Sequence, residues 1–347
     1  MHNFQTTDSD LDRAAELLRQ GRLVAFPTET VYGLGCDASS EAALKRLYLV
    51  KGRPVDHPVI VHIAAVADLE KWAAPIPPAA YKLAEAFWPG PLTLILPRAA
   101  QVSRLVTGGQ DSVGLRVPAH PLARKLIERF GGGLAAPSAN RFGRLSPTTA
   151  QAVREGLGDD VDMVLDGGPC DVGIESTIVS LVGERPAILR PGMIDVKAIE
   201  AVLGLAVEAG SAATAKTKPD QGDAIRVPGA LPSHYAPRTP MAVAQSADII
   251  ELFGEGLAIG RNQGVIAFEE TVEAMKSSFG QGFLNAMEFE TWIVAPDDAG
   301  EYARRIYDSL RRLDQLALHK ILVEAVPTGT AWDGVRDRLT RASAPQL

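Results

Sequence analysis

RLVAFPTETVYGLGCDASSEAALKRLYLVKGR, residues 22–53, contains a strand-like segment, a polar loop and a helix-like segment in succession. Residues 22–26 are short and apolar, which predicts a strand, and residues 40–50 predict a helix that ends near Gly52. The loop between them, residues 27–35, follows directly on the strand. Because α/β proteins usually bind ligands at strand ends, this stretch predicts both an α/β fold and a candidate binding loop.

The same alternation continues on both sides of this stretch. Further strands are predicted at residues 58–63, 92–96, 113–117, 133–136, 161–165, 177–182 and 187–189, and further helices at residues 9–20, 121–130 and 147–155. Such an order of elements predicts a mixed sheet covered by helices.

A change of composition divides the chain. The 347 residues favour two domains over one, and residues 210–222 lack any apolar period, which predicts a linker. A second α/β pattern begins near Met241. Its predicted strands are residues 257–259, 264–268, 291–294 and 320–324, and its predicted long helix is residues 299–316. Gly254-Glu255-Gly256 suggests only loosely a dinucleotide-binding loop, and we interpret it as a turn.

Composition excludes several classes of protein. The chain is 46% hydrophobic and 22% charged, and no apolar run approaches the roughly 20 residues of a membrane helix. The N-terminus lacks the order of a signal peptide, so we expect a cytoplasmic protein without a membrane segment. The formal net charge of −7 argues against a general nucleic-acid coat. The sequence contains no GxxxxGK[ST], HExxH, CxxC or GxSxG motif, which argues against the corresponding phosphate-loop, zinc and hydrolase sites.

Two motifs offer groups suited to a ligand. The loop 27–35 supplies two threonines, a glutamate, a tyrosine and two glycines that permit close backbone approach, although a structured turn is the alternative. Lys51 and Arg53, separated by Gly52, could converge on one phosphate, because arginine offers a planar fork and lysine a point charge. A basic pair at the end of a helix also compensates the helix dipole, so both interpretations remain open.

Two further motifs place polar groups at strands. Arg116 lies within the apolar strand 113–117, where an unpaired charge would be costly, so it needs an anionic partner from the protein or from a ligand. Ser138 and Asn140 follow the strand 133–136 and supply hydroxyl and amide groups without bulk, as a nucleotide site would require. A plain exit from strand to loop is the alternative for this second motif.

Seven motifs taken together resemble the YrdC/Sua5 family. In order between about residues 20 and 237 they are PTETVYGLG, KGRP, SVGLRVP, APSAN, ESTIV, LRPG and HYAP. The KxR and SxN motifs at this spacing are specific to that family, and the rest of the chain is similar to the additional domain of Sua5-type members. The resemblance implies an open twisted mixed α/β sheet with a basic concave pocket, and a second, smaller Rossmann-like domain. It implies a catalytic domain over 1–205, a linker over 206–237 that covers the active site as a lid, and a C-terminal domain over 238–347.

The resemblance also implies an activity. A threonylcarbamoyl-AMP synthase converts L-threonine, bicarbonate or CO2, and ATP to threonylcarbamoyl-AMP, pyrophosphate and water. The product would pass to the tRNA threonylcarbamoyl-transfer machinery, which forms N6-threonylcarbamoyladenosine at position 37 of tRNAs that read codons beginning with A. Mg2+ would accompany the ATP phosphates with few protein ligands, so no protein metal site is expected, and a monomer is the default assembly.

Site residues carry over from the family motif by motif. The positions implied to hold L-threonine are Thr30, His62, Arg116, Ala136 and Ser176. The positions implied to contact ATP are Arg53, His57, Ser112, Ser138, Ser146, Arg190 and, from the linker, Arg226. The two signature motifs give the implied catalytic set of Lys51, Arg53, Ser138 and Asn140. The family usually has asparagine where this chain has His57, so we expect a pH-sensitive contact there.

Two other functions deserve comparison. A module that binds RNA directly through the basic pocket is the main alternative, and the acidic net charge disfavours it. A carbamoyl-transfer enzyme that uses carbamoyl phosphate would carry acylphosphatase and zinc-finger segments, and this sequence contains neither.

Overall fold

The computed structural model describes residues 6–209, 225–279 and 291–345, which form two compact units. The first unit comprises Met1–Phe142 and Ser146–Ala230, and the second comprises Gly143–Leu145 and Leu231–Leu347. Residues 210–224, which include all of the aperiodic segment 210–222 of the predicted linker, lie outside the described residues. Among the described residues, no helix combines the length and apolarity needed to cross a membrane.

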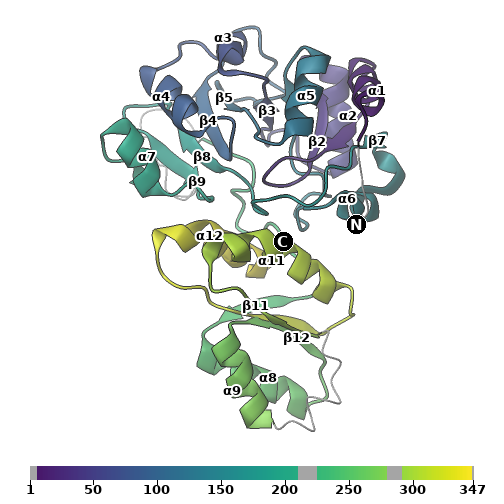
Figure 1. The fold of residues 1–347 in the computed structure, drawn as a ribbon, viewed down its shortest axis with the longest axis vertical. Coiled ribbons are helices and arrows are strands. Elements are labelled where there is room, and N and C mark those ends of the chain that lie inside the picture. Colours follow the sequence, from purple (N-terminus) through teal and green to yellow (C-terminus); the bar gives the residue numbers. More distant parts are fainter. Residues whose placement is uncertain (1–5, 210–224, 280–290, 346–347) are drawn as a thin grey trace. The chain divides into compact units, whose positions relative to one another are not determined.

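The first unit is built on a ten-stranded mixed sheet in the order β10-β9-β8-β4-β5-β3-β6-β2-β1-β7 (Figure 1). Its strands are β1 (Val24–Phe26), β2 (Gly33–Asp37), β3 (Ile60–His62), β4 (Leu92–Pro97), β5 (Ser112–Arg116), β6 (Leu134–Ala135), β7 (Met163–Val164), β8 (Thr177–Ser180), β9 (Ala187–Arg190) and β10 (Glu208–Ala209). Its helices are α1 (Asp8–Arg19), α2 (Glu41–Lys51), α3 (Leu69–Trp72), α4 (Pro78–Phe87), α5 (Pro121–Phe130), α6 (Ala150–Leu157) and α7 (Val196–Leu203), with short 3-10 turns η1 (Val66–Asp68) and η2 (Gly158–Asp160).

The alternation of side chains along the strands separates a core face from a polar face. Val113 and Leu115 of β5 enter the main hydrophobic core with residues of α2, α4 and α7. Ser112, Gly114 and Arg116 therefore project to the other face, because successive side chains of a strand point to opposite sides. That second face is covered in part by α1 and α5, and in part by a small cluster to which Val227 belongs.

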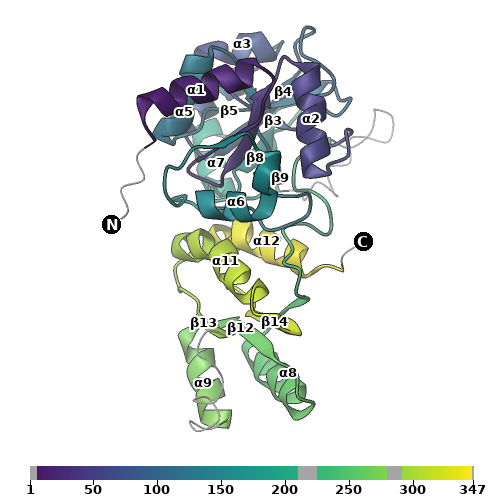
Figure 2. The same cartoon turned by 90° about the vertical axis from the view of Figure 1, so that its right-hand side faces the viewer.

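The second unit is a four-stranded parallel sheet in the order β11-β14-β12-β13. Its elements are β11 (Met241–Ala244), α8 (Ser246–Ala258), β12 (Gln263–Ala267), α9 (Glu269–Phe279), β13 (Trp292–Val294), α11 (Ala299–Asp314), β14 (Lys320–Glu324), η4 (Thr330–Trp332) and α12 (Asp333–Ser343). Within this unit, α8 and α9 cover one face of the sheet and α11 and α12 the other (Figures 1 and 2). The predicted Rossmann-like α/β class is confirmed for this unit.

Two predicted elements were wrong in detail. The predicted strand 257–259 is the end of helix α8, in which Ile249 and Phe253 are buried one turn apart, so helical rather than strand periodicity governs this segment. Gly254 and Gly256 accordingly lie inside the helix, so they form no ligand loop and our interpretation of them as a turn was wrong. The predicted helix 147–155 begins only at Ala150, because the side chain of Thr149 accepts the N–H of Ala152 and caps it there.

Candidate active site

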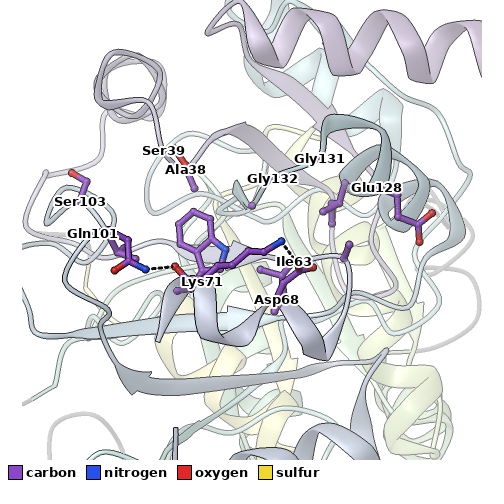
Figure 3. A pocket seen from close by; sticks show the side chains of 15 residues that line it. Ala38, Ser39, Ile63, Asp68, Lys71, Gln101, Ser103, Glu128, Gly131 and Gly132 are labelled. Atoms are coloured by element: carbon purple, nitrogen blue, oxygen red, sulfur yellow. Dashed lines mark hydrogen bonds and ion pairs between the residues drawn. The ribbon is translucent and has the colours of Figure 1, made fainter. Parts of the chain in front are cut away.

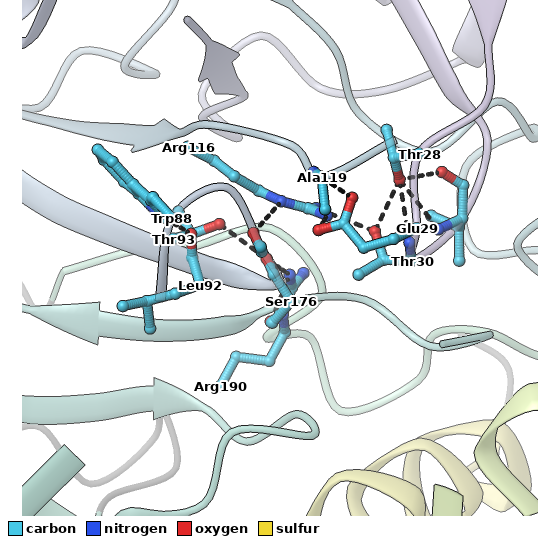
Figure 4. Close-up of polar contacts among 12 residues, drawn as sticks. Thr28, Glu29, Thr30, Trp88, Leu92, Thr93, Arg116, Ala119, Ser176 and Arg190 are labelled. Carbon is cyan, nitrogen blue, oxygen red and sulfur yellow. Dashed lines mark hydrogen bonds and ion pairs between the residues drawn. The ribbon is translucent and has the colours of Figure 1, made fainter. Parts of the chain in front are cut away.

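Arg116 lies at the end of β5 and is 4% exposed. In the parallel pairing of β3 and β5 it is the direct neighbour of His62. Its Nε donates to the carbonyl of Gly90 at 3.2 Å, one terminal nitrogen donates to Thr30 Oγ1 at 2.9 Å, and the other donates to Glu29 Oε1 at 2.6 Å (Figure 4). The buried charge of Arg116 therefore has a protein partner in Glu29, while its binding of a ligand carboxylate stays a prediction.

Glu29 is the residue that sequence reasoning left without a role. It is 6% exposed, and its second oxygen accepts the backbone N–H of Ala119 at 2.9 Å. The glutamate was visible in the polar loop 27–35, but no spacing rule connects a loop residue with a strand residue 87 positions away.

His62 is a neutral imidazole beside Arg116. It is 3% exposed, and its Nδ1 has no hydrogen-bond partner among the described residues. Burial, together with the nearby charge of Arg116, lowers the pKa of His62 to about 3. His62 therefore presents an uncharged ring nitrogen to the polar face over the whole physiological pH range.

Ser176 and Arg190 are joined by several hydrogen bonds. Arg190 donates from Nε and from one terminal nitrogen to the Ser176 carbonyl, at 3.1 and 2.9 Å, and that nitrogen also lies 3.2 Å from the Ser176 hydroxyl. The hydroxyl pairs in addition with Thr93 Oγ1 at 2.7 Å (Figure 4). Arg190 also donates to the carbonyl of Pro228 at 2.9 Å. Thr93, which is fully buried, is a second residue that sequence reasoning missed.

Lys51 connects the KxR and SxN motifs. Helix α2 ends at Gly52 in the left-handed conformation, with φ of 63°, and Lys51 is the last helical residue. Its ammonium nitrogen donates to the carbonyls of Ser138 and Asn140, both at 2.5 Å. Burial lowers the pKa of Lys51 well below its usual value, with contributions from neighbouring arginines. Lys51 is turned to the SxN backbone in this structure, and its convergence with Arg53 on one anion stays a prediction.

Arg53 and His57 lie in the turn after α2. Arg53 donates to the carbonyls of His57 at 3.3 Å and Pro58 at 2.7 Å, and its guanidinium lies 5.6 Å from the centre of the Phe142 ring. Burial lowers the pKa of His57, and the charge of Arg53 lowers it further. The expected pH-sensitive contact at His57 is therefore confined to acidic pH.

The remaining predicted positions lie on the same unit. Ser146 donates to the buried carboxylate of Glu175, and Ala136 donates its backbone N–H to the carbonyl of Ile60 on β3. Arg226 bonds through its guanidinium to the carbonyls of Asp56 and Gly108, at 3.2 and 2.8 Å. Its backbone forms a reciprocal pair with the Gln110 side chain, which accepts at 2.7 Å and donates at 3.0 Å.

A groove of about 520 Å³ elsewhere in the first unit contains none of the predicted site residues (Figure 3). It is lined by α3, residues 101–103 and the glycine run 131–133. Lys71 and Asp68 pair with each other at 2.7 Å there. The hydrogen-bonded groups of the polar sheet face, rather than this groove, make up the candidate active site.

Comparison with known proteins identifies the family of this chain. The Sua5/YciO/YrdC family model, described as telomere recombination, matches residues 16–192, and a model described as the threonylcarbamoyl-AMP synthase C-terminal domain matches residues 194–344. The threonylcarbamoyl-AMP synthase of Pyrococcus abyssi is 40% identical over 340 residues, which cover 96% of this chain and 94% of the relative. The chain belongs to the Sua5/YciO/YrdC family.

A second curated relative and a solved structure also match the chain over nearly its full length. The threonylcarbamoyl-AMP synthase of Bacillus subtilis is 39% identical over 348 residues, covering 99% of this chain and 96% of the relative. The crystal structure of P. abyssi Sua5 complexed with L-threonine superimposes with a TM-score of 0.85 at 37% identity, covering 98% of this chain and 95% of that one. The match extends through both units, as do the two family models taken together.

Proposed function

We propose that this chain is an L-threonylcarbamoyl-AMP synthase. It converts L-threonine, bicarbonate or CO2, and ATP to threonylcarbamoyl-AMP, pyrophosphate and water, for the modification of position 37 in tRNAs that read codons beginning with A. Full-length relatives named for this activity, and the related Sua5 structure that holds L-threonine, support the proposal.

The observation that carries the proposal is the junction of Ser176 and Arg190. Ser176 belongs to the residues that we assign to threonine, and Arg190 belongs to those that we assign to ATP. Their hydrogen bonds, at 2.9 to 3.2 Å, bring the two halves of the site into direct contact. A reaction that joins a carbamate on threonine to the α-phosphate of ATP requires such adjacency.

In the threonine half, the two charged ends of the substrate determine our assignments. Arg116 receives the carboxylate of threonine, and Thr30, which is already bonded to Arg116, lies beside it. His62 offers its unpaired ring nitrogen to a polar group of the substrate. Ala136 and Ser176 complete this half.

In the nucleotide half, Lys51 acts on the SxN backbone. By holding the carbonyls of Ser138 and Asn140, its ammonium keeps the Ser138 and Asn140 side chains in place for ATP. Arg53, Arg190 and Arg226 supply positive charge near the phosphates, and His57, Ser112 and Ser146 supply polar contacts. Preorganised cations of this kind stabilise charge that develops on the phosphates in the transition state.

The reaction follows in two steps. The bound α-ammonium of threonine first gives up a proton. The resulting amine attacks CO2, which bicarbonate supplies by losing water, and releases a second proton as the carbamate forms. A carbamate oxygen then attacks the α-phosphorus, and pyrophosphate leaves. The labile carbamate needs shelter from water, which is the role that we give to the linker 206–237 as a lid over the active site. The linker connects the catalytic domain 1–205 with the C-terminal domain 238–347.

Mg2+ has no dedicated cage among the described residues. No group of three or more histidine, cysteine or acidic side chains in residues 6–209, 225–279 and 291–345 could hold a metal ion. We propose that Mg2+ arrives with ATP and is held chiefly by phosphate oxygens, and no step above depends on a protein-bound metal. We further propose a cytoplasmic monomer that passes its product to the tRNA threonylcarbamoyl-transfer machinery.

The test is an incubation of the protein with ATP, labelled bicarbonate and one amino acid at a time. Release of pyrophosphate should depend on L-threonine, and the label should appear in a nucleotide product. Serine and valine serve as comparisons, since serine lacks the methyl group of the threonine side chain and valine has a methyl group in place of its hydroxyl. Pyrophosphate release that does not depend on an added amino acid would contradict the proposed function.

A further inference from the structure

The buried pair of Glu29 and Arg116 has no net charge and is hydrogen-bonded at several points. Glu29 Oε1 accepts from Arg116 at 2.6 Å and Oε2 accepts from Ala119 at 2.9 Å (Figure 4). Arg116 uses three of the five N–H groups of a guanidinium on Gly90, Thr30 and Glu29. Both partners are thus fixed in place while each keeps capacity for further hydrogen bonds.

The spare capacity of the pair matches the charged ends of an amino acid. Arg116 keeps one unused N–H on each terminal nitrogen, as counted among the contacts of the described residues, and a carboxylate has two oxygens to accept them. Each oxygen of Glu29 keeps an unused lone pair that can accept from an ammonium group. The zwitterion of threonine is neutral, so its binding to this neutral pair buries no net charge.

Without Glu29, the charge balance would change. A lone Arg116 would repel the α-ammonium of threonine, and burying the resulting net positive charge would be costly. The site would then favour threonine with a neutral amine, which together with Arg116 is again free of net charge. Only a small fraction of free threonine has that form near neutral pH.

We infer that Glu29 makes this site select the zwitterion of threonine, by supplying the negative charge that balances its α-ammonium group. This inference rests on the proposed function, because it takes Arg116 as the group that binds the threonine carboxylate. Glu29 is therefore a specificity-determining residue for the proposed reaction.

The neighbouring titratable side chains do not change charge between pH 7 and 9, so they do not interfere with a pH-dependent test of the inference. Among the described residues, His62 on β3, His120 before α5 and Cys170 before β8 interact electrostatically with the pair. Asp171 acts in turn on His120 and Cys170, and Arg190 on β9 bonds to Ser176. Burial lowers the pKa of both histidines and raises the pKa of the Cys170 thiol, so all three stay neutral in this range. The ammonium of threonine is then the group whose titration the comparison reports.

The experiment measures KM for threonine and KM for ATP between pH 7 and 9 in the wild type, Glu29→Gln and Glu29→Asp. Glu155→Gln, on the exposed side of α6, controls for the change in overall charge. For Glu29→Gln, KM for threonine should rise at least tenfold at pH 7. As the pH rises to 9 and the α-ammonium of threonine deprotonates, the KM for threonine of Glu29→Gln, divided by that of the wild type, should fall by up to about tenfold per pH unit. For Glu29→Asp and Glu155→Gln, the ratio of KM for threonine to the wild-type value should not change with pH. KM for ATP in Glu29→Gln should not show the pH dependence expected for threonine.

A second measurement does not depend on pH. The desamino analogue 3-hydroxybutanoate has the carboxylate and hydroxyl of threonine but lacks the ammonium. It should inhibit Glu29→Gln at least tenfold more tightly than the wild type, because the variant site lacks the negative charge that opposes a lone anion. A constant KM ratio across pH, or equal inhibition of both proteins, would overturn the inference.

Failure of this inference can be told apart from failure of the proposed function. Arg116→Ala should raise KM for threonine whether or not Glu29 selects the zwitterion. If the wild type shows no threonine-dependent pyrophosphate release, or Arg116→Ala leaves KM for threonine unchanged, the proposed function or its site assignment fails. If both of those results hold and the Glu29→Gln profile is flat, only the role of Glu29 fails.

Discussion

His62 links the chemistry of the site to the stability of its unit. Its pKa of about 3 in the folded protein, against 6.5 for an ordinary histidine, means that only the unfolded chain binds a proton between these values. Its contribution to the free energy of unfolding is complete above pH 6.5 and declines as the pH falls toward 3. The decline is about 1.4 kcal/mol per pH unit within this window, or about 2 kcal/mol at pH 5.

His62→Asn removes this ionisable group while it keeps a polar side chain. We expect the unfolding free energy of the variant, measured with denaturant at pH 7.5 and pH 5, to fall by about 2 kcal/mol less than that of the wild type. The transition followed should be that of the first unit, since the two units can unfold separately. Equal losses in both proteins would mean that His62 is protonated in the folded state.

Some residues of the proposed site could be placed from the sequence, and others could not. Strand alternation placed Ser112 and Arg116 on one face of β5, and parallel pairing then set His62 beside Arg116. The Glu29 contact could not be predicted in this way, because Glu29 comes from a loop whose path depends on tertiary packing. Lys51 was predicted to lie in the site, but not its turn toward the SxN backbone, since a long side chain can adopt many rotamers.

At the scale of elements, the turn after β9 fixes the segment that carries Ser176. A Cβ atom at Gly192 would lie 2.5 Å from the backbone nitrogen of Thr177 and 2.9 Å from the carbonyl oxygen of Glu175. These are backbone atoms at the start of β8, so the strand itself would have to move. Gly192→Ala should destabilise the unit by about 2 kcal/mol and lower turnover at least tenfold by displacing Ser176.

Gly156→Ala is the matched control for this substitution. Gly156 lies in helix α6, its added Cβ would meet no atom within 4 Å, and its φ is not positive. Alanine should therefore raise the unfolding free energy by up to about 1 kcal/mol and leave turnover unchanged. Thermal melts and pyrophosphate release of both variants provide the comparison, and normal turnover in Gly192→Ala would show that β8 can shift without cost to the site.

Helices and strands with clear capping residues or a clear apolar pattern were predicted better than those without. Helix α2 has a serine cap at one end and a left-handed glycine at the other, and it was predicted within a residue or two. Strand β2 was interpreted as part of the polar loop, because its glycines weaken the strand pattern. Those glycines have a packing cause, since a Cβ at Gly35 would lie 2.6 Å from the Phe26 ring.

At the scale of the whole molecule, the chain passes between its two units more than once. Residues Gly143–Leu145 belong to the second unit, where Ala236 donates its backbone N–H to the carbonyl of Gly143 at 2.9 Å. The proposed site residues Asn140 and Ser146 stand on either side of this short excursion. Residues 225–230 in turn belong to the first unit, so the predicted linker 206–237 contributes residues to both units.

Gln110 fastens residues 225–230 to the first unit. Its side-chain amide accepts from the backbone nitrogen of Arg226 at 2.7 Å and donates to the carbonyl of the same residue at 3.0 Å. The next residues are held by the small apolar cluster around Val227 and by the bond from Arg190 to Pro228. Loss of the Gln110 amide should therefore loosen the segment locally at Arg226 without unfolding the unit.

Gln110→Ala removes this reciprocal pair, which contributes roughly 1 kcal/mol. We expect hydrogen exchange at the amide of Arg226 to accelerate about five- to tenfold, and KM for ATP to rise by a similar factor if Arg226 contacts the nucleotide. KM for threonine should change less, because Arg116 and Thr30 bond to neither residue. Gln101→Ala, which removes an exposed amide that donates to the carbonyl of Lys71, is the control and should change neither quantity. Faster exchange with an unchanged KM for ATP would remove Arg226 from the nucleotide site and leave it a structural anchor of the linker.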